Sequence, residues 1–261
     1  MPFVDRQGVK LYWNQLGAGP PVLLIMGLSF THEMWFRVVP WLAESYRIIL
    51  FDNRGMGRSD VPRGPYRIST MAHDAAAVLD AAGVTAAHII GASMGGMIAQ
   101  ELALRYPRRI LSLLLGCTSY GGLLARWPDF SRRPRNLPLT ANARAEREAV
   151  LAPLLYADST PHERIMEDIR IRCQCNWSYK GFWSQLAGIL MWNSYLRLPR
   201  IQAPTLVVHG AEDRLIPPQN GRVIASRIPQ ARFELIKNAG HILTTDQPEA
   251  CVQLMTGFLP R

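Results

Sequence analysis

The sequence predicts an α/β protein with a doubly wound, mostly parallel sheet and a helical segment inserted near the middle of the chain. Short continuous apolar runs alternate with stretches whose apolar residues recur at helical spacing, which is typical of buried parallel strands between helices. This alternation stops after Cys117 and resumes at Thr205. We therefore expect a core made of residues 1–118 and 199–261, with residues 119–198 as the inserted helical segment.

The predicted strands are short apolar runs that end at glycine, proline or polar turn residues. The first two form a pair around a turn near Gln7-Gly8, and the others are continuous apolar runs, as expected for strands covered on both faces. In chain order the strands are residues 3–17 (the pair), 22–25, 46–51, 87–92, 110–115, 205–210 and 232–236.

The predicted helices lie between these strands and within the inserted segment. Pro40 bends or delays the first helix, and Pro107 ends the third. Ser69 or Thr70 is expected to cap the second helix. In chain order the helices cover residues 33–44, 70–81, 94–106, 142–155, 161–173, 181–191, 218–228 and 248–258.

Composition is that of an ordinary globular enzyme. The chain has 261 residues, 48% of them hydrophobic and 19% charged, which is enough to bury a sizeable core. No apolar stretch is long enough to span a bilayer and the first residues lack an apolar signal core, so we expect a cytoplasmic protein without a membrane partner. The four cysteines follow neither a disulfide pattern nor the spacing of a metal site, and we expect no cofactor and no metal.

The charge balance is strongly basic, with a net charge of +9. Nucleic-acid binding is one interpretation of this value. The arginines are scattered, however, and no nucleic-acid-binding motif accompanies them. We therefore favour a solvated basic surface and expect no nucleic-acid partner; attraction of anionic substrates is the lesser alternative.

The strongest functional signal lies between Ala87 and Pro107. A strand ending at Ala92 leads, with no room for a loop, into a helix that starts at Met94. Ser93 therefore occupies a sharp strand-to-helix corner, where flanking glycines let strand and helix pack closely. The corner exposes the Ser93 hydroxyl, and the amide of Met94 lies in the positive field of the helix N-terminus, where an oxyanion is stabilised.

The rest of the chain decides between a nucleophile and an incidental serine in a glycine-rich turn. A serine nucleophile needs a base, and the base needs an orienting carboxylate. Because parallel strands deliver the loops that follow them to one edge of the sheet, both partners are expected just after strands. Asp213 and His241 lie in two such loops. We predict Ser93, Asp213 and His241 as nucleophile, acid and base, with Glu212 as a second choice for the acid.

Together these segments resemble the α/β-hydrolase family. The resemblance implies the α/β-hydrolase fold, and it assigns the family's acid to Asp213 and its base to His241. It spans nearly the whole predicted core. Four segments carry it, in the family's order: Gly91-Ala92-Ser93-Met94-Gly95-Gly96, residues 52–60, residues 210–217 and Asn238-Ala239-Gly240-His241.

One position departs from the family pattern. In many relatives the strand before the first helix ends in His-Gly, whereas this chain has Met26-Gly27. The resemblance implies the backbone N–H of Leu28 as the second oxyanion donor beside that of Met94, and a backbone donor needs no particular side chain. Relatives that act on haloalkanes or epoxides are expected to have aspartate at the corner, so Ser93 argues against both substrates.

In this family an insertion at the position of residues 119–198 forms a helical cap above the serine, and we call this segment the cap. It is rich in aromatic residues. Some of these side chains are expected to pack the cap onto the core, and the others to line an apolar pocket. We predict Trp183 and Trp192 as substrate-binding residues of such a pocket.

The sequence thus predicts a serine carboxylesterase or lactonase that cleaves a small ester or lactone with an apolar acyl or ring portion. The reaction would proceed through a Ser-His-Asp triad and an acyl-enzyme. Two alternatives stay open. One is a carbon–carbon bond hydrolase that uses the same triad, and the other is a non-catalytic small-molecule receptor on the same fold, which an intact triad disfavours.

Overall fold

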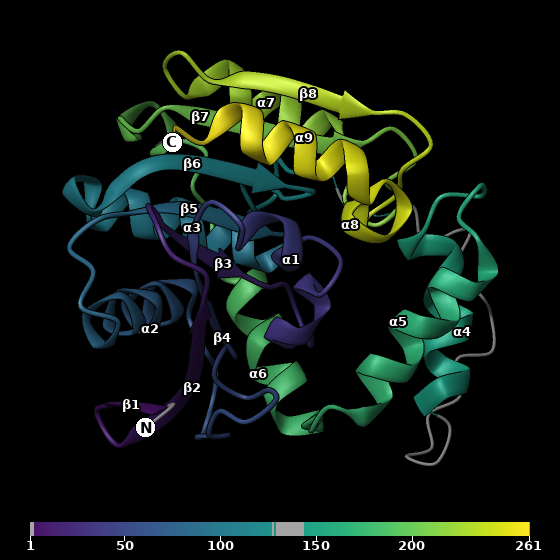
Figure 1. Cartoon of the computed structure of the whole chain (residues 1–261), viewed down its shortest axis with the longest axis horizontal. Helices are drawn as coiled ribbons and strands as arrows, with labels where there is room; N and C mark the ends of the chain where they lie inside the picture. The colour runs from purple at the N-terminus through teal and green to yellow at the C-terminus, as the bar shows by residue number, and fades with distance from the viewer. Residues whose placement is uncertain (1–2, 127, 129–143, 261) are drawn as a thin grey trace.

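An eight-stranded sheet forms the centre of the computed structural model, which describes residues 3–126, 128 and 144–260 (Figure 1). The strands follow the order β1-β2-β4-β3-β5-β6-β7-β8 across the sheet. Their bounds are β1 Phe3–Arg6, β2 Val9–Leu16, β3 Pro21–Ile25, β4 Arg47–Phe51, β5 Ala87–Ala92, β6 Ile110–Gly116, β7 Thr205–Gly210 and β8 Arg232–Ile236.

Most pairings in this sheet are parallel. β1 pairs with β2 and β2 with β4 in the antiparallel sense, and each pairing from β4 through β3, β5, β6 and β7 to β8 is parallel. Because β3 lies between β4 and β5, the chain winds outward from β3 in both directions. The predicted doubly wound, mostly parallel α/β fold is confirmed.

Two layers of helices cover the sheet. Their bounds are η1 His32–Trp35, α1 Val39–Leu42, α2 Ile68–Ala81, α3 Met94–Arg105, α7 Gln219–Arg227 and α9 Pro248–Phe258. In β3, Leu23 and Ile25 pack in the cluster that contains α2, α3 and α7, whereas Val22 and Leu24 pack in the cluster that contains η1, α1 and α9. Because successive strand residues face opposite sides, β3 is buried on both faces, which explains its continuous apolar sequence.

The cap contains the three helices that the sequence predicts there. They are α4 Arg144–Leu155, α5 His162–Gln174 and α6 Tyr179–Leu190; residues 142–143 of the first predicted helix lie outside the described residues. Figure 1 shows α4 and α5 side by side at the right of the molecule, next to the short helix α8, Leu243–Asp246. Within the described part of the chain, no helix has both the length and the apolar character needed to cross a bilayer.

The first two predicted helices differ from the structure in how they begin. The single helix expected over 33–44 is divided into η1 and α1, and Pro40 lies in the first turn of α1, where its missing N–H leaves no intrahelical bond unmade. The second helix, α2, begins at Ile68, and the residue at its N-cap position is Arg67, whose side chain makes no capping hydrogen bond. The predicted cap by Ser69 or Thr70 is therefore wrong, because both residues are already helical.

Candidate active site

The corner between β5 and α3 holds Ser93 in a strained backbone conformation. Its φ of 58° and ψ of −122° lie where residues other than glycine are rarely found. Hydrogen bonds from outside the corner help to hold the residue there: the Ser93 N–H donates to the Gly116 carbonyl over 2.8 Å, and the Thr118 hydroxyl donates to the Ser93 carbonyl over 2.7 Å. A β-carbon on Gly95 would lie 2.9 Å from the Met26 carbonyl oxygen, so glycine is needed for α3 to approach β3 this closely.

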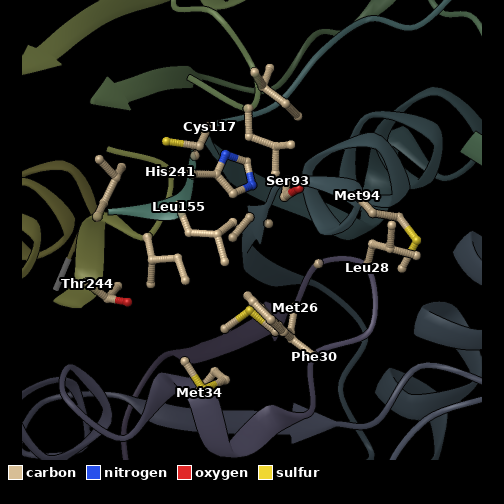
Figure 2. Close-up of a pocket in the computed structure, with 18 of the residues that line it drawn as sticks. Met26, Leu28, Phe30, Met34, Ser93, Met94, Cys117, Leu155, His241 and Thr244 are labelled. Carbon is tan, nitrogen blue, oxygen red and sulfur yellow. The ribbon is translucent and has the colours of Figure 1, made fainter. Parts of the chain in front are cut away.

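Asp213 and His241 meet at the same edge of the sheet. Asp213 follows β7 and His241 follows β8, and 2.9 Å separates Asp213 Oδ2 from His241 Nδ1. The other carboxylate oxygen accepts the N–H groups of Leu215 at 3.0 Å and Ile216 at 2.8 Å. Because the carboxylate accepts, Nδ1 carries the ring proton and Nε2 is the basic nitrogen of a neutral ring. Figure 2 shows one ring nitrogen of His241 directed at the Ser93 hydroxyl.

Two backbone amides near the serine suit an oxyanion. Met94 is the first residue of α3, and Leu28 lies in the loop that follows β3; Figure 2 shows both residues beside Ser93. Neither amide donates a hydrogen bond to any of the residues that the structure describes. Each is therefore a donor available to a ligand, and the Met94 amide also lies at the positive end of α3.

An apolar cavity of about 350 Å³ opens at this point, and both Ser93 and His241 lie on its wall. The core residues of the lining are mostly apolar, and methionine and leucine are the commonest among them (Figure 2). The cap contributes residues of α4 and α6, among them Leu151, Leu154, Leu155, Phe182, Leu186 and Ile189. A cavity of this size and polarity fits a small, largely apolar ligand.

Comparison with known proteins shows the family of this chain. Residues 20–248 match the sequence profile of the alpha/beta hydrolase fold family. The chain belongs to the α/β-hydrolases. It is 31% identical to a putative carbamate hydrolase RutD of Azorhizobium caulinodans, over 99% of this chain and 98% of that one. It is 32% identical to a poly(3-hydroxyalkanoate) depolymerase of Ectopseudomonas oleovorans, over 92% of this chain and 84% of that one.

A solved structure supports the same relationship. The enol-lactonase of Burkholderia xenovorans superposes on this hydrolase with a TM-score of 0.86. The two sequences are 26% identical, and the match covers 98% of this chain and 99% of the enol-lactonase.

The two tryptophans predicted to bind substrate do not line the cavity of this hydrolase. Trp183 is half exposed, and its ring packs edge-on against the rings of Tyr179 and Phe182, so that Phe182 and not Trp183 reaches the cavity wall. Trp192 is buried beyond the end of α6, where its indole N–H donates to Glu101 over 2.8 Å. For Trp183 the physical reason is helical periodicity, because the next side chain along a helix points about 100° away from its neighbour, here the cavity-lining Phe182.

Cys117 completes a cluster that has the composition of a metal site. Its Sγ, one oxygen of Asp213 and one ring nitrogen of His241 lie within 4.8 Å of one another. Burial, followed by the negative charge of Asp213, raises the pKa of the Cys117 thiol well above its usual range, whereas a metal ligand must be a thiolate. Both Asp213 oxygens already accept hydrogen bonds, so the cluster fits a proton-transfer pair better than a metal centre.

Two buried polar residues near the site were not anticipated from the sequence. Gln185 of α6 contacts the loop of Leu28, and Asp246 of α8 accepts the N–H of Gly240, beside His241, over 2.6 Å. Burial raises the pKa of Asp246 to about 6. A glutamine among apolar residues of a helix was the available signal for Gln185; no local signal distinguishes Asp246 from an exposed acid.

Proposed function

We propose that this hydrolase cleaves a carboxylic ester or lactone through a nucleophilic Ser93. The observation that carries the proposal is the arrangement of Ser93, His241 and Asp213 on the wall of one apolar cavity. The Ser93 hydroxyl faces one ring nitrogen of His241. The other ring nitrogen is hydrogen-bonded to the fully buried carboxylate of Asp213. This is the arrangement that activates a serine: the base takes its proton, and the carboxylate orients the base and stabilises its charged form.

The first half of the reaction forms an acyl-enzyme. Ser93 Oγ attacks the carbonyl carbon as its proton passes to His241 Nε2, and the carbonyl electron pair moves onto oxygen. The N–H groups of Leu28 and Met94 hold that oxyanion. The tetrahedral intermediate then collapses, the carbon–oxygen bond of the ester breaks, and His241 returns the proton to the departing alkoxide.

Water completes the cycle by the same route in reverse. It gives a proton to His241 and adds to the acyl carbon, and the second intermediate expels Ser93 Oγ, which recovers its proton from His241. The apolar cavity supports a substrate with an apolar acyl or ring portion, since it excludes water and offers few polar groups. Relatives named as an enol-lactonase and a poly(3-hydroxyalkanoate) depolymerase support an ester or lactone as the cleaved bond.

The test combines active-site labelling with one substitution. A fluorophosphonate probe should label the wild-type protein at Ser93, and Ser93→Ala should abolish both labelling and turnover of an ester and lactone panel. Losses of about 10⁶-fold are known for triad serines in a well-studied protease. Near-wild-type turnover by Ser93→Ala would overturn the mechanism. Absence of labelling and turnover in the wild type would favour a receptor, and turnover of vinylogous diketones alone would favour carbon–carbon bond cleavage.

A further inference from the structure

The loop that carries the Leu28 donor lacks the histidine expected at its start. Met26 stands at that position, and its side chain lines the cavity. The loop is also strained, because Ser29, the residue after the donor, has a φ of +62°. A donor on such a loop stays directed at an oxyanion only where other groups hold the loop.

Gln185 of the cap holds this loop from outside. Its side chain is fully buried, and its Oε1 accepts the Ser29 N–H over 3.0 Å. Its Nε2 donates to the carbonyl of Arg54 over 2.9 Å. Since one partner is a donor and the other an acceptor, the amide has one orientation that satisfies both.

The backbone of α6 is fixed on either side of Gln185. Gly181 and Gly188 lie about one turn before and after it and face the backbone of Gly55 and Tyr66, respectively. A β-carbon on Gly181 would come within 2.8 Å of the Gly55 carbonyl carbon, and one on Gly188 within 2.8 Å of that of Tyr66. The helix is therefore seated directly on the neighbouring loop, which leaves the Gln185 amide little freedom to shift.

A second amide holds the other side of the donor. Asn53 Nδ2 donates to the Met26 carbonyl over 2.8 Å. The Leu28 N–H thus lies between a carbonyl anchored by Asn53 and an amide anchored by Gln185. The first anchor belongs to the core and the second to the cap.

We propose that Gln185 is a positioning residue for the oxyanion hole of the proposed reaction. By accepting the Ser29 N–H, it keeps the preceding Leu28 N–H directed at the oxygen that becomes negative when Ser93 attacks. The inference rests on the proposed function. It also links the cap to catalysis, since Phe182 and Leu186 of the same helix line the cavity.

The experiment compares three substitutions. Gln185→Met keeps the length of the side chain and removes both hydrogen bonds. Gln185→Glu keeps an acceptor, and its protonated form supplies one donor and one acceptor as glutamine does. Gln253→Met makes the first change at an exposed glutamine of α9 and serves as the control. For each variant we would measure the melting temperature, kcat, KM and the Kd of a boronic acid, which forms a tetrahedral adduct with an active serine.

We expect Gln185→Met to lower kcat by about 10- to 100-fold and to weaken boronate binding by a similar factor, with KM within about threefold of wild type, because removal of an oxyanion donor itself costs about 10²–10³-fold. Gln185→Glu should approach the wild-type kcat, measured at the same pH, as the pH falls and the carboxyl becomes protonated. Gln253→Met should resemble the wild type.

Three outcomes would overturn the inference. The first is an unchanged kcat and boronate affinity in a folded Gln185→Met variant. The second is a loss that falls on KM alone or follows the melting temperature, which indicates a purely structural role. The third applies if Gln185→Met does not fold: it is a Gln185→Glu variant whose kcat, relative to that of the wild type, does not change with pH. Retained turnover in Ser93→Ala would instead reject the proposed function, and this inference with it.

Discussion

The choice of the acid is made at the scale of single residues, between two adjacent carboxylates. Asp213 is buried and bonds to His241 and to two backbone amides. Glu212 turns the other way, accepts the N–H of Asp158 over 3.1 Å and lies 4.0 Å from Arg214. These contacts support Asp213, the first choice from the sequence, as the partner of His241.

Substitution of these two acids should therefore have very different effects. Asp213→Asn should lower kcat by about 10⁴-fold, as in a well-studied serine protease, because an amide neither stabilises the protonated ring nor favours the required tautomer. Glu212→Gln is the matched control and should leave kcat within a few-fold of wild type. Steady-state kinetics on one ester would decide the question. A crippled Glu212→Gln beside an active Asp213→Asn would show that the acid is assigned wrongly.

At the scale of elements, the loop after β8 is held by the cap and by α8. The N–H groups of His241 and Ile242 both donate to the carbonyl of Leu155, the last residue of α4. Asp246 accepts the N–H of Gly240 and, over 2.6 Å, the hydroxyl of Thr160 in the cap. The proposed base is thus positioned by a segment from another part of the chain.

Two charged residues, Arg164 and Asp168, lie near Asp246. Arg164 donates to its backbone carbonyl over 3.5 Å, and the carboxylate of Asp168 acts on it at longer range. Burial raises the pKa of Asp168 as well as that of Asp246, so the folded protein disfavours the ionised form of each acid more than water does. Stability in this region should consequently depend on pH.

The sign of that dependence follows from the raised pKa. The pKa of Asp246 is about 6 in the folded chain against an ordinary 3.8, so its contribution to stability is complete only below pH 3.8 and is lost progressively as the pH rises to about 6. Asp246→Asn cannot ionise. We expect the unfolding free energy of wild type relative to this variant to fall by up to about 3 kcal/mol between pH 4 and 7.

Urea unfolding of both proteins at several pH values would measure this difference. The contribution of Asp168 is present in both and largely cancels. Glu249→Gln, which neutralises an exposed acid three residues away, is the control and should show no such trend. Parallel curves for wild type and Asp246→Asn would contradict the prediction.

At the scale of the whole molecule, the cavity exists only where cap and core meet. The core supplies Ser93 and His241, and α6 supplies an apolar wall. The outer side of α6 is also apolar, with Trp183 and Tyr179 exposed. A substrate that reaches the inner wall should therefore depend on Phe182 and not on its neighbour.

Phe182→Ala and Trp183→Ala test this arrangement as a matched pair. Loss of the Phe182 ring should lower kcat/KM for long acyl esters by about tenfold relative to short ones, because apolar contact contributes roughly 25 cal/mol per Å² buried. Trp183→Ala should leave that ratio near its wild-type value and affect mainly the melting temperature. The prediction fails if Trp183→Ala shifts the chain-length preference as strongly as Phe182→Ala does.

The sequence alone was sufficient to predict the fold class and the succession of strands and helices along the chain. It was also sufficient to select Ser93, Asp213 and His241 as candidate site residues. These features depend on short-range patterns. A strand buried on both faces, such as β3, is continuously apolar, and the corner at Ser93 needs glycines within two or three residues. The residues that follow the strands of a parallel sheet then converge, whatever the details of packing.

The tertiary structure alone decided which side of α6 faces the cavity, and which buried amide and carboxylate hold the loops. Apolar residues on both sides of a helix do not reveal its inner face, so Trp183 and Phe182 could not be told apart in advance. Gln185 bonds to groups 131 and 156 residues away, and Asp246 to Thr160, 86 residues away. No local sequence pattern predicts such partners, because they come close to one another only when the cap packs on the core.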